Sequence, residues 1–478
     1  MNRGKVLVAG AFNVLHPGHI RLLRFARECG DKLIVAVHSD RLAASDAHVP
    51  EQLRLEGILS NSWVDEAFIL DEPVTNLISQ LRPDIVVKGR EYESSFNPEA
   101  AALGKYGGKL LFSSGENIFS SIDLIRKEFE SFKSRTVTLP KDYLERHGLS
   151  VGQLVERLDL FTKLRVCVVG DVIVDEYITC EPLGMSQEDP TIVVTPVDSI
   201  SFVGGAGIVA AHAANLGASV QFVSVTGSDV ARDFILEKLA ESNVKNCLLV
   251  DASRPTTLKQ RFRSKGKSLL RVSHLHQGSI SLALQNEMLL TLEKMMESCD
   301  LLVFSDFNYG CLPQTLVDQI TSLAKKNHVM IAADSQSSSQ VGDISRFKSV
   351  DLLTPTEREA RISTRNREDG LVILAEQLRQ QSSACNILLK LGEEGVLIHA
   401  KNDGAKQGWF TDRIDALNST PKDVAGAGDS LLITSALTLA SGGSIWEAAC
   451  LGSLAAAIQV GRVGNTPIRA SELLQQLV

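Results

Sequence analysis

Short runs of apolar residues alternate with amphipathic stretches along the first part of the chain, up to about Glu130. Short apolar runs predict buried strands, and apolar residues three to four positions apart predict helices packed on them. The predicted strands cover residues 6–9, 32–37, 67–70 and 84–88, and the predicted helices cover 20–29, 54–59 and 75–81. Strands that alternate with helices predict right-handed crossovers and a parallel sheet.

The pattern changes near residue 134. Residues 134–162 are polar and mostly helical in spacing, without a buried strand, so we expect a helical linker between a first domain at 1–133 and a second at 163–478. Apolar runs resume in the second domain, and its last stretch is rich in Ala and Gly and helical. The predicted strands there begin at residue 164 and continue at 220–225, 301–305, 329–333, 350–353 and 386–390. The expected fold class is therefore α/β in both domains.

Length, charge and cysteine content narrow the class of protein. A chain of 478 residues exceeds one core, because cores stop growing near ~250–300 residues. The formal net charge of -8 argues against a nucleic-acid surface. The 8 cysteines are scattered without a CxxC pair, which favours a reducing compartment over disulfides or zinc. No apolar run suits a signal peptide or a membrane span. We expect a cytoplasmic protein that binds neither nucleic acid nor membrane.

The first candidate site lies in the segment GAFNVLHPGH, residues 10–19, which follows a predicted strand and opens a helix. Nucleotides bind at this edge of a parallel sheet, and the helix N-terminus adds a positive partial charge. His16 and His19, three residues apart, can donate hydrogen bonds to a triphosphate as charge moves to the leaving pyrophosphate. The alternative is that both are turn and capping residues.

This segment resembles the HxGH signature of the cytidylyltransferase-like superfamily, whose members transfer a nucleotidyl group from a nucleoside triphosphate to a phosphate. The likeness continues at residues 30–40, 54, 64–65, 82–92 and 120–121. The resemblance implies a Rossmann-like nucleotidyltransferase domain in which His16 and His19 stabilise the transition state. It also implies a nucleotide site lined by Gly10, Phe12, Lys88, Gly89, Ser120 and Ser121.

Two positions depart from that family. The acidic residue of its FDxLHxGH pattern is Asn13 here, and residues 41–48 contain no lysine where the family carries one that contacts the phosphates. Arg41 and His48 are the candidate substitutes. Loss of one cation removes charge stabilisation from the transition state, so slow or altered transfer is an open alternative.

The second candidate site is the segment DVAGAGDS, residues 423–430, which precedes an Ala- and Leu-rich helix. Small residues allow backbone amides to crowd an anion at a helix N-terminus. Asp429 at this point can accept the proton of a substrate hydroxyl during phosphoryl transfer. The alternative is a glycine-rich turn in which Asp429 caps the helix.

Together with upstream segments, this turn resembles the ribokinase/phosphofructokinase-B sugar kinases from residue 163 to the end of the chain. The similar segments are residues 170–177, 204–206, 354–359, 390–395 and 426–429. The resemblance implies a ribokinase-like α/β domain with a small β lid, and Asp429 as the base. It places Asp171, Asp175, Gly204 and Gly205 at the sugar, Glu357 near magnesium, and Lys390, Gly392, Gly395, Gly426, Ala427 and Gly428 at the nucleotide. Strand-end capping is the alternative for both aspartates.

The motif set further resembles the bifunctional heptose-7-phosphate kinase/heptose-1-phosphate adenylyltransferase family, with Lys259, Arg261 and Arg271 where that family carries Lys or Arg. In that family the kinase module comes first, so the resemblance implies a swapped order here. Three positions depart from it, with Ile208 in place of Asn, and Tyr309 and Gln336 in place of Lys. These changes indicate a different sugar phosphate or a kinase half with reduced activity.

The sequence thus predicts a bifunctional sugar kinase and nucleotidyltransferase that uses Mg²⁺, with ATP or CTP and a sugar phosphate as substrates. An ADP-heptose-like product is the leading expectation, and a CDP-linked product is the near alternative. The alternative from another class is that one half has lost turnover and serves as a binding or scaffold module. Dimerising ribokinase-like relatives lead us to expect a homo-oligomer.

Overall fold

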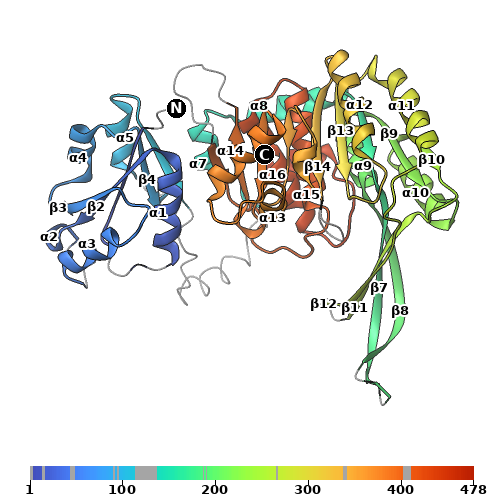
Figure 1. Cartoon of the computed structure of the whole chain (residues 1–478), viewed down its shortest axis with the longest axis horizontal. Helices are drawn as coiled ribbons and strands as arrows, with labels where there is room; N and C mark the ends of the chain where they lie inside the picture. The colour runs from blue at the N-terminus through green and yellow to red at the C-terminus, as the bar shows by residue number, and fades with distance from the viewer. Residues whose placement is uncertain are drawn as a thin grey trace. The chain divides into compact units, whose positions relative to one another are not determined.

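A computed structural model describes residues 4–12, 15, 17–43, 49–89, 92–93, 96–113, 137–186, 188–189, 191–264, 267–336, 342–401 and 411–477 (Figure 1). The chain divides into two compact units. Unit 1 comprises residues 1–134 with 368–374, and unit 2 comprises residues 135–367 with 375–478. No helix among the described residues is long and apolar enough to cross a membrane.

Unit 1 contains a five-stranded parallel sheet in the order β3-β2-β1-β4-β5. The strands are β1 Lys5–Gly10, β2 Lys32–His38, β3 Glu66–Leu70, β4 Ile85–Gly89 and β5 Lys109–Ser113. The helices are α1 Pro17–Cys29, α2 Asp40–Ala43, α3 Glu51–Leu59, α4 Val74–Leu81 and α5 Pro98–Gly104. Because the strand order reverses beside β1, the β1/β4 edge is the topological switch point where α/β sheets bind ligands.

Unit 2 contains a nine-stranded sheet in the order β10-β9-β6-β13-β14-β15-β16-β17-β18. These strands are β6 Arg165–Gly170, β9 Ser219–Thr226, β10 Lys245–Val250, β13 Leu301–Asp306, β14 Met330–Ser335, β15 Leu352–Leu353, β16 Asn386–Lys390, β17 Val396–Ala400 and β18 Thr411–Ile414. The pairings are parallel from β10 to β16 and antiparallel from β16 to β18. The α/β fold class predicted for both domains is confirmed.

Helices of unit 2 pack against this sheet. They are α7 Lys141–Arg146, α8 Val151–Leu160, α9 Ala206–Asn215, α10 Val230–Glu241, α11 Leu282–Met296, α12 Gln314–Lys326, α13 Glu357–Thr364, α15 Ala427–Ala440, α16 Ile445–Val460 and α17 Ala470–Leu477, with short 3-10 turns η3 Phe161–Lys163, η4 Ile344–Arg346 and η5 Gly392–Glu394. Helix α14, Leu371–Ser382, is divided between the units, since its residues 371–374 are assigned to unit 1. Helices α15 and α16 are buried on nearly all sides, because small and apolar residues surround both axes.

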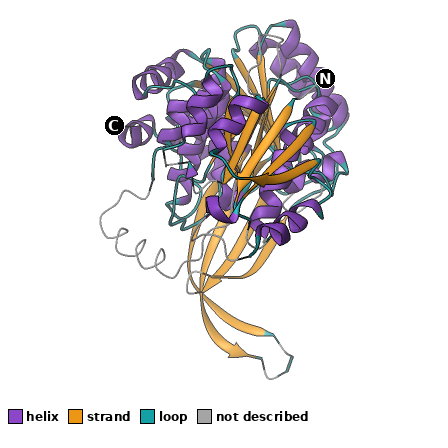
Figure 2. Ribbon diagram, turned by 90° about the vertical axis from the view of Figure 1, so that its left-hand side faces the viewer, coloured by secondary structure: helices purple, strands orange, loops and turns teal. Residues whose placement is uncertain are grey.

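A second sheet forms the lid of unit 2, in the order β12-β11-β7-β8. Its strands are β7 Val172–Met185, β8 Ile192–Gly205, β11 Thr257–Ser264 and β12 Lys267–His274. The β7–β8 hairpin extends well beyond the helical layers (Figure 2). Its outer part is largely exposed on both faces, whereas its inner ends carry the buried residues Asp175 and Val203.

The segment predicted as a linker packs into the core of unit 2. Leu154, Leu158 and Phe161 are buried in the same apolar cluster as residues of α9, α15 and α16. The Tyr143 hydroxyl donates a hydrogen bond to the backbone carbonyl of Trp446 at 2.9 Å. The polar residues of this segment therefore form the outer faces of α7 and α8, and the few apolar ones attach both helices to unit 2.

We predict that the fold loses stability as the pH falls from about 6.5 to about 4, in part because of His212. His212 is fully buried in α9, and its Nδ1 accepts a hydrogen bond from the backbone N–H of Ile468 at 3.0 Å. Burial, with a smaller effect of Arg462, lowers the pKa of this imidazole to about 3. The unfolded chain therefore binds a proton that the folded chain does not, so the stability present above pH ~6.5 decreases by about 3 kcal/mol at pH ~4.

Urea unfolding across this pH range measures the effect. His212→Asn keeps an acceptor for Ile468 but cannot titrate, so its stability should depend less steeply on pH than that of the parent protein. Equal slopes for the two proteins would show that His212 does not contribute.

Candidate functional site

Asp429 lies in the first turn of α15, directly after the glycine-rich segment. Gly426 caps this helix with a φ of +77°, a conformation that glycine adopts without strain. Small residues at 426–428 leave the backbone N–H groups of the first turn open to an anion. The Asp429 side chain is buried, and burial, followed by the charge of Asp334, raises the pKa of its carboxyl to about 7. A carboxyl with that pKa can exchange a proton near neutral pH.

Lys390 provides a buried cation beside the same loop. Its ammonium donates to Asp334 Oδ2 at 2.8 Å, and a Cβ added to Gly428 would lie 3.1 Å from Lys390 Nζ. Burial alone would lower the pKa of Lys390, but the carboxylates of Asp334 and Glu359 raise it. Lys390 is therefore charged, and a charge in a buried site acts strongly on a phosphate.

Asp175 lies at the inner end of the lid, and several groups converge on its carboxylate. Asn465 Nδ2 donates to Oδ2 at 3.3 Å, and Arg261 approaches Oδ1 at 3.5 Å. An added Cβ at Gly204 would lie 2.2 Å from Asp175 Oδ2, so this approach requires glycine. At Gly205, whose φ is +60°, an added Cβ would lie 2.3 Å from the backbone oxygen of Asp171. Gly204 thus allows lid strand β8 to pass close to the Asp175 carboxylate, and Gly205 allows it to pass close to the Asp171 backbone.

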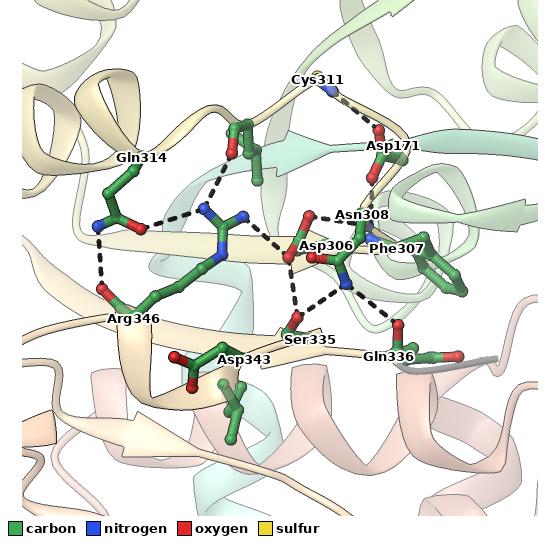
Figure 3. Close-up of polar contacts among 12 residues, drawn as sticks. Asp171, Asp306, Phe307, Asn308, Cys311, Gln314, Ser335, Gln336, Asp343 and Arg346 are labelled. Carbon is green, nitrogen blue, oxygen red and sulfur yellow. Dashed lines mark hydrogen bonds and ion pairs between the residues drawn. The ribbon is translucent and has the colours of Figure 1, made fainter. Parts of the chain in front are cut away.

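Asp171, which the sequence analysis places at the sugar, is held by backbone amides (Figure 3). Its Oδ2 accepts from the N–H groups of Phe307 at 2.8 Å and Tyr309 at 3.2 Å, and its Oδ1 accepts from that of Cys311 at 3.2 Å. Burial, together with the charge of Asp306, raises the pKa of Asp171 to about 6. These hydrogen bonds hold the loop after β13 against the Asp171 carboxylate, and contact between Asp171 and a sugar stays a prediction.

Lys259 connects the lid with that loop. It pairs with Asp175 in the β11–β7 register, and its Nζ lies 5.0 Å from the ring centroid of Phe307 and 5.1 Å from that of Tyr309. The two rings therefore support the ammonium group through cation–π contacts. Burial raises the pKa values of Asp175 and Asp429, and the charge of Lys259 partly opposes this rise. Lys259 thus lies within electrostatic reach of both acids.

The residues predicted to contact the nucleotide or magnesium include two further segments, the turn around η5 and the start of α13. Gly392 and Gly395, with φ values of +64° and +90°, form the turn around η5, and an added Cβ at Gly395 would lie 2.0 Å from the backbone oxygen of Ile414. Glu357, the residue predicted to lie near magnesium, pairs with Arg361 at 2.7 Å, and its side chain is 43% exposed. Glu359 instead is buried, and its charge raises the pKa values of Lys390 and Asp334. Sequence reasoning missed Glu359, although it lies in the same TPTERE segment.

No group of three or more His, Cys, Asp or Glu side chains among the described residues could hold a metal ion by itself. Mg²⁺ in phosphoryl-transfer sites is held by one or two carboxylates together with phosphate oxygens. Glu357 and Glu359, both in the first turn of α13, supply carboxylates of the kind that Mg²⁺ prefers.

In unit 1, Phe12 and His19 form the described part of the HxGH site. Phe12 is buried with a φ of 52°, which is strained for a bulky residue, and its ring packs against Gly10. The His19 ring meets the Phe12 ring edge-on at 5.2 Å, in the first turn of α1. His16, Ser120 and Ser121 lie outside the described residues. The Phe12 ring therefore limits the orientations open to the His19 imidazole.

Lys88 and Gly89 end β4, next to β1 at the switch point. The Lys88 ammonium pairs with Glu99 at 2.9 Å and lies 5.0 Å from the ring centroid of Tyr92. Arg54 is fully buried, and its guanidinium donates to the backbone oxygens of Ala11 at 2.6 Å and His38 at 2.8 Å. Arg54 thus ties together the carboxyl ends of β1 and β2, where the nucleotide site is predicted.

Comparison with known families matches both units. Residues 163–470 match the model described as pfkB family carbohydrate kinase, and residues 7–111 match the cytidylyltransferase-like model. The bifunctional protein HldE of Desulfatibacillum aliphaticivorans is 32% identical over 324 residues, covering 67% of this chain and 64% of that protein. HldE of Helicobacter hepaticus is 30% identical over 322 residues, covering 66% of this chain and 64% of that protein. The aligned part of the chain thus spans less than two thirds of the length of these relatives.

Solved structures show the same fold as unit 2. Arabidopsis thaliana ribokinase complexed with ribose and ATP gives a TM-score of 0.52 at 19% identity, covering 66% of this chain and 98% of that one. Escherichia coli phosphofructokinase-2 in complex with substrates and products gives a TM-score of 0.53 at 16% identity, with the same two coverages of 66% and 98%.

Proposed function

The chain belongs to the pfkB family of carbohydrate kinases, and on that premise we propose that it is a bifunctional enzyme of sugar phosphates. Unit 2 phosphorylates a sugar phosphate of the heptose 7-phosphate type from ATP. Unit 1 transfers a nucleotidyl group to a sugar 1-phosphate, giving an ADP-heptose-like product and pyrophosphate. The cytidylyltransferase-like match and the HldE relatives support this pairing of activities. We further propose that the two modules stand in the reverse of the order in those relatives.

The buried Asp429 carboxyl at the start of α15 is the observation that carries the kinase proposal. The acceptor hydroxyl of the sugar gives its proton to Asp429 as its oxygen bonds to the γ-phosphorus of ATP, and ADP departs. Backbone N–H groups at Gly426, Ala427 and Gly428 donate hydrogen bonds to the phosphoryl oxygens, on which negative charge develops. Lys390 adds a fixed positive charge beside them. Mg²⁺, when bound, neutralises charge on the nucleotide phosphates.

The sugar side of the kinase site is formed by Asp175 with the lid cations Lys259 and Arg261. A carboxylate accepts hydrogen bonds from sugar hydroxyls, and the two cations suit a substrate that already carries a phosphate. Gly204 and Gly205 keep this end of the lid close to the acid. We assign Asp171 to the support of this site, and we place magnesium nearer to Glu359 than to Glu357.

In unit 1, an oxygen of the sugar 1-phosphate attacks the α-phosphorus of the nucleoside triphosphate, and pyrophosphate leaves. His19 in the first turn of α1 donates a hydrogen bond to the leaving phosphates, and His16 is proposed to do the same. The helix N-terminus adds positive partial charge. Gly10, Phe12, Lys88 and Gly89, with Ser120 and Ser121, complete the proposed nucleotide site. ATP is the proposed nucleotide, and CTP with a CDP-linked product is the near alternative.

The second candidate function is that one half of the chain binds its ligand without turning it over. Two observations favour this alternative. The Lys88 ammonium is already paired with Glu99, and Ile208, where the family resemblance implies a polar residue, is buried in α9. Phosphorus NMR with Mg–ATP, Mg–CTP and a panel of sugar phosphates distinguishes these candidate functions. ADP with a doubly phosphorylated sugar establishes the kinase, pyrophosphate with a nucleotide-sugar signal establishes the transferase, and the absence of both favours a binding protein.

A homo-oligomer in the cytoplasm is also part of the proposal. The outer lid exposes large apolar side chains, among them Leu183, Met185, Ile192, Val197 and Ile200. An apolar surface of this kind is expected to be covered by a second copy of the chain. Sedimentation analysis of the purified protein tests this part, and a monomer at micromolar concentration would contradict it.

Gly426→Ala is expected to lower kcat/KM for phosphoryl transfer about tenfold or more and to destabilise unit 2 by about 1 kcal/mol. The φ of +77° is strained for alanine, and the added Cβ would lie 2.4 Å from Asn465 Oδ1. Asn465 would then be displaced from Asp175, to which it donates. Gly148→Ala is the matched control, because Gly148 has a φ of +63° with nothing within 4 Å of an added Cβ. Equal kinetic effects of the two substitutions would contradict the prediction.

A further inference from the structure

Gln336 follows directly after β14 and contacts the proposed base. Its Nε2 donates a hydrogen bond to Asp429 Oδ1 at 2.9 Å. The Gln336 amide is therefore a neutral hydrogen-bond donor to this carboxyl.

The backbone of Gln336 is fixed on both sides by a polar network (Figure 3). The Gln336 N–H donates to the backbone oxygen of Asp306 at 2.8 Å, and Asn308 Nδ2 donates to the Gln336 carbonyl at 3.4 Å. The Asp306 carboxylate, which is 1% exposed, anchors this network. It accepts from Arg346 at 2.8 Å, from Ser335 Oγ at 2.8 Å and from the N–H of Asn308 at 3.1 Å.

Asn308 is itself held in an unusual conformation, with a φ of 61°. A non-glycine residue persists there only when its surroundings determine its position, and the hydrogen bonds to Asp306, Ser335 and Gln336 supply that constraint. The buried ion pair, the strained Asn308 and the end of β14 therefore give Gln336 one defined position. The Gln336 side chain reaches from this network to the base.

We propose that Gln336 is a positioning residue for phosphoryl transfer. Its amide holds one oxygen of Asp429, so that the other oxygen is presented to the acceptor hydroxyl. This inference rests on the proposed kinase function. The Asp306–Arg346 network lies outside the glycine-rich loop. In this proposal it holds Gln336 in place, and Gln336 in turn orients Asp429.

The charges around Asp429 show why an amide matters here. Asp334 and Asp175 disfavour the ionised carboxyl, Lys390 and Lys259 favour it, and burial opposes it most strongly. A neutral donor stabilises the carboxylate without the larger decrease in basicity that an adjacent ammonium causes. Gln336 therefore favours ionisation of Asp429 and leaves it basic enough to accept a proton near neutral pH.

The first test needs no substrate. In protein labelled with ¹³C at the aspartate carboxyl carbon, the Asp429 signal is identified by its absence in Asp429→Asn. Gln336→Leu removes the donor, so the titration midpoint of Asp429 should rise by about one pH unit. Gln336→Lys adds a cation, so the midpoint should fall below that of the parent protein. Gln314→Leu is the control, because Gln314 contacts Arg346 in the same network without touching Asp429.

The second test follows turnover of heptose 7-phosphate with Mg–ATP against pH. The acidic limb of kcat in Gln336→Leu should move in parallel with the NMR midpoint, with kcat near pH ~7 reduced about tenfold and KM for ATP unchanged. An unchanged midpoint and an unchanged limb in folded Gln336→Leu would overturn the role of Gln336. Phosphoryl transfer that survives Asp429→Asn would instead overturn the proposed base, so the two failures are distinguishable.

Discussion

Asp429→Asn is expected to reduce kcat for phosphoryl transfer by about 10²–10⁴-fold, with little change in KM for ATP. Asparagine keeps the shape of the side chain and can still accept from Gln336, but it cannot take up the proton of the acceptor hydroxyl. The backbone amides of residues 426–428 and the Lys390 cation remain in place, so nucleotide binding should persist. Steady-state kinetics with a phosphorylated sugar measures the loss.

The same substitution should not destabilise the protein, which separates a chemical effect from a folding defect. Burial raises the pKa of Asp429 to about 7 in the folded chain, whereas an unfolded aspartate titrates near ~3.9. Above pH ~7 the folded protein therefore carries an unfavourable buried charge, which costs up to about 4 kcal/mol. Asp429→Asn removes that charge, so its unfolding free energy at pH ~8 should equal or exceed that of the parent protein.

The pH dependence of the parent enzyme follows from the same carboxyl. The base must be ionised to accept a proton, so kcat should fall with a slope of one as the pH drops below about 7. This limb is a property of Asp429 and should be missing from the residual rate of Asp429→Asn. A residual rate that keeps the same limb would assign the titration to another group.

The fold was largely predictable because most strands of the five-stranded and nine-stranded sheets are largely buried. Continuous apolar runs such as those of β1, β2, β6 and β13 predict buried strands. The outer lid has no such signal, since most of β8 is exposed and neither face of the outer hairpin meets a core. Only the family resemblance predicted the lid. The segment 134–162, predicted as a helical linker, contains few apolar residues, and these suffice to attach α7 and α8 to unit 2.

The candidate sites were predictable where function depends on local backbone shape. The glycine-rich turn before Asp429 and the pair Gly204-Gly205 are such cases. Contacts between distant segments gave no local signal. Asn465 reaches Asp175 from far along the chain, and Gln336 stood out as a missing lysine and not as a donor to the base. Asp171 illustrates the remaining difficulty, because a motif position does not show that backbone amides already occupy the carboxylate.

His19→Ala is expected to lower kcat/KM for nucleotidyl transfer by about 10²–10³-fold, the usual effect of losing one donor to charge that develops in the transition state. His19 occupies the first turn of α1, and the edge-on contact with Phe12 at 5.2 Å restricts its ring. Alanine retains the helix and its partial charge, so the loss measures the imidazole alone. Release of pyrophosphate from Mg–ATP with a heptose 1-phosphate, followed by phosphorus NMR, provides the measurement.

The two substitutions should act on different reactions, because each unit has its own core and its own proposed site. His19→Ala should leave phosphoryl transfer unchanged, and Asp429→Asn should leave pyrophosphate release unchanged. If either substitution abolished both activities in a folded protein, the reactions would share a residue or a conformational step, and independent modules would be the wrong description. If His19→Ala changed nothing while pyrophosphate was still released, the leaving phosphates would be stabilised by other groups, and His16 would be the next residue to replace.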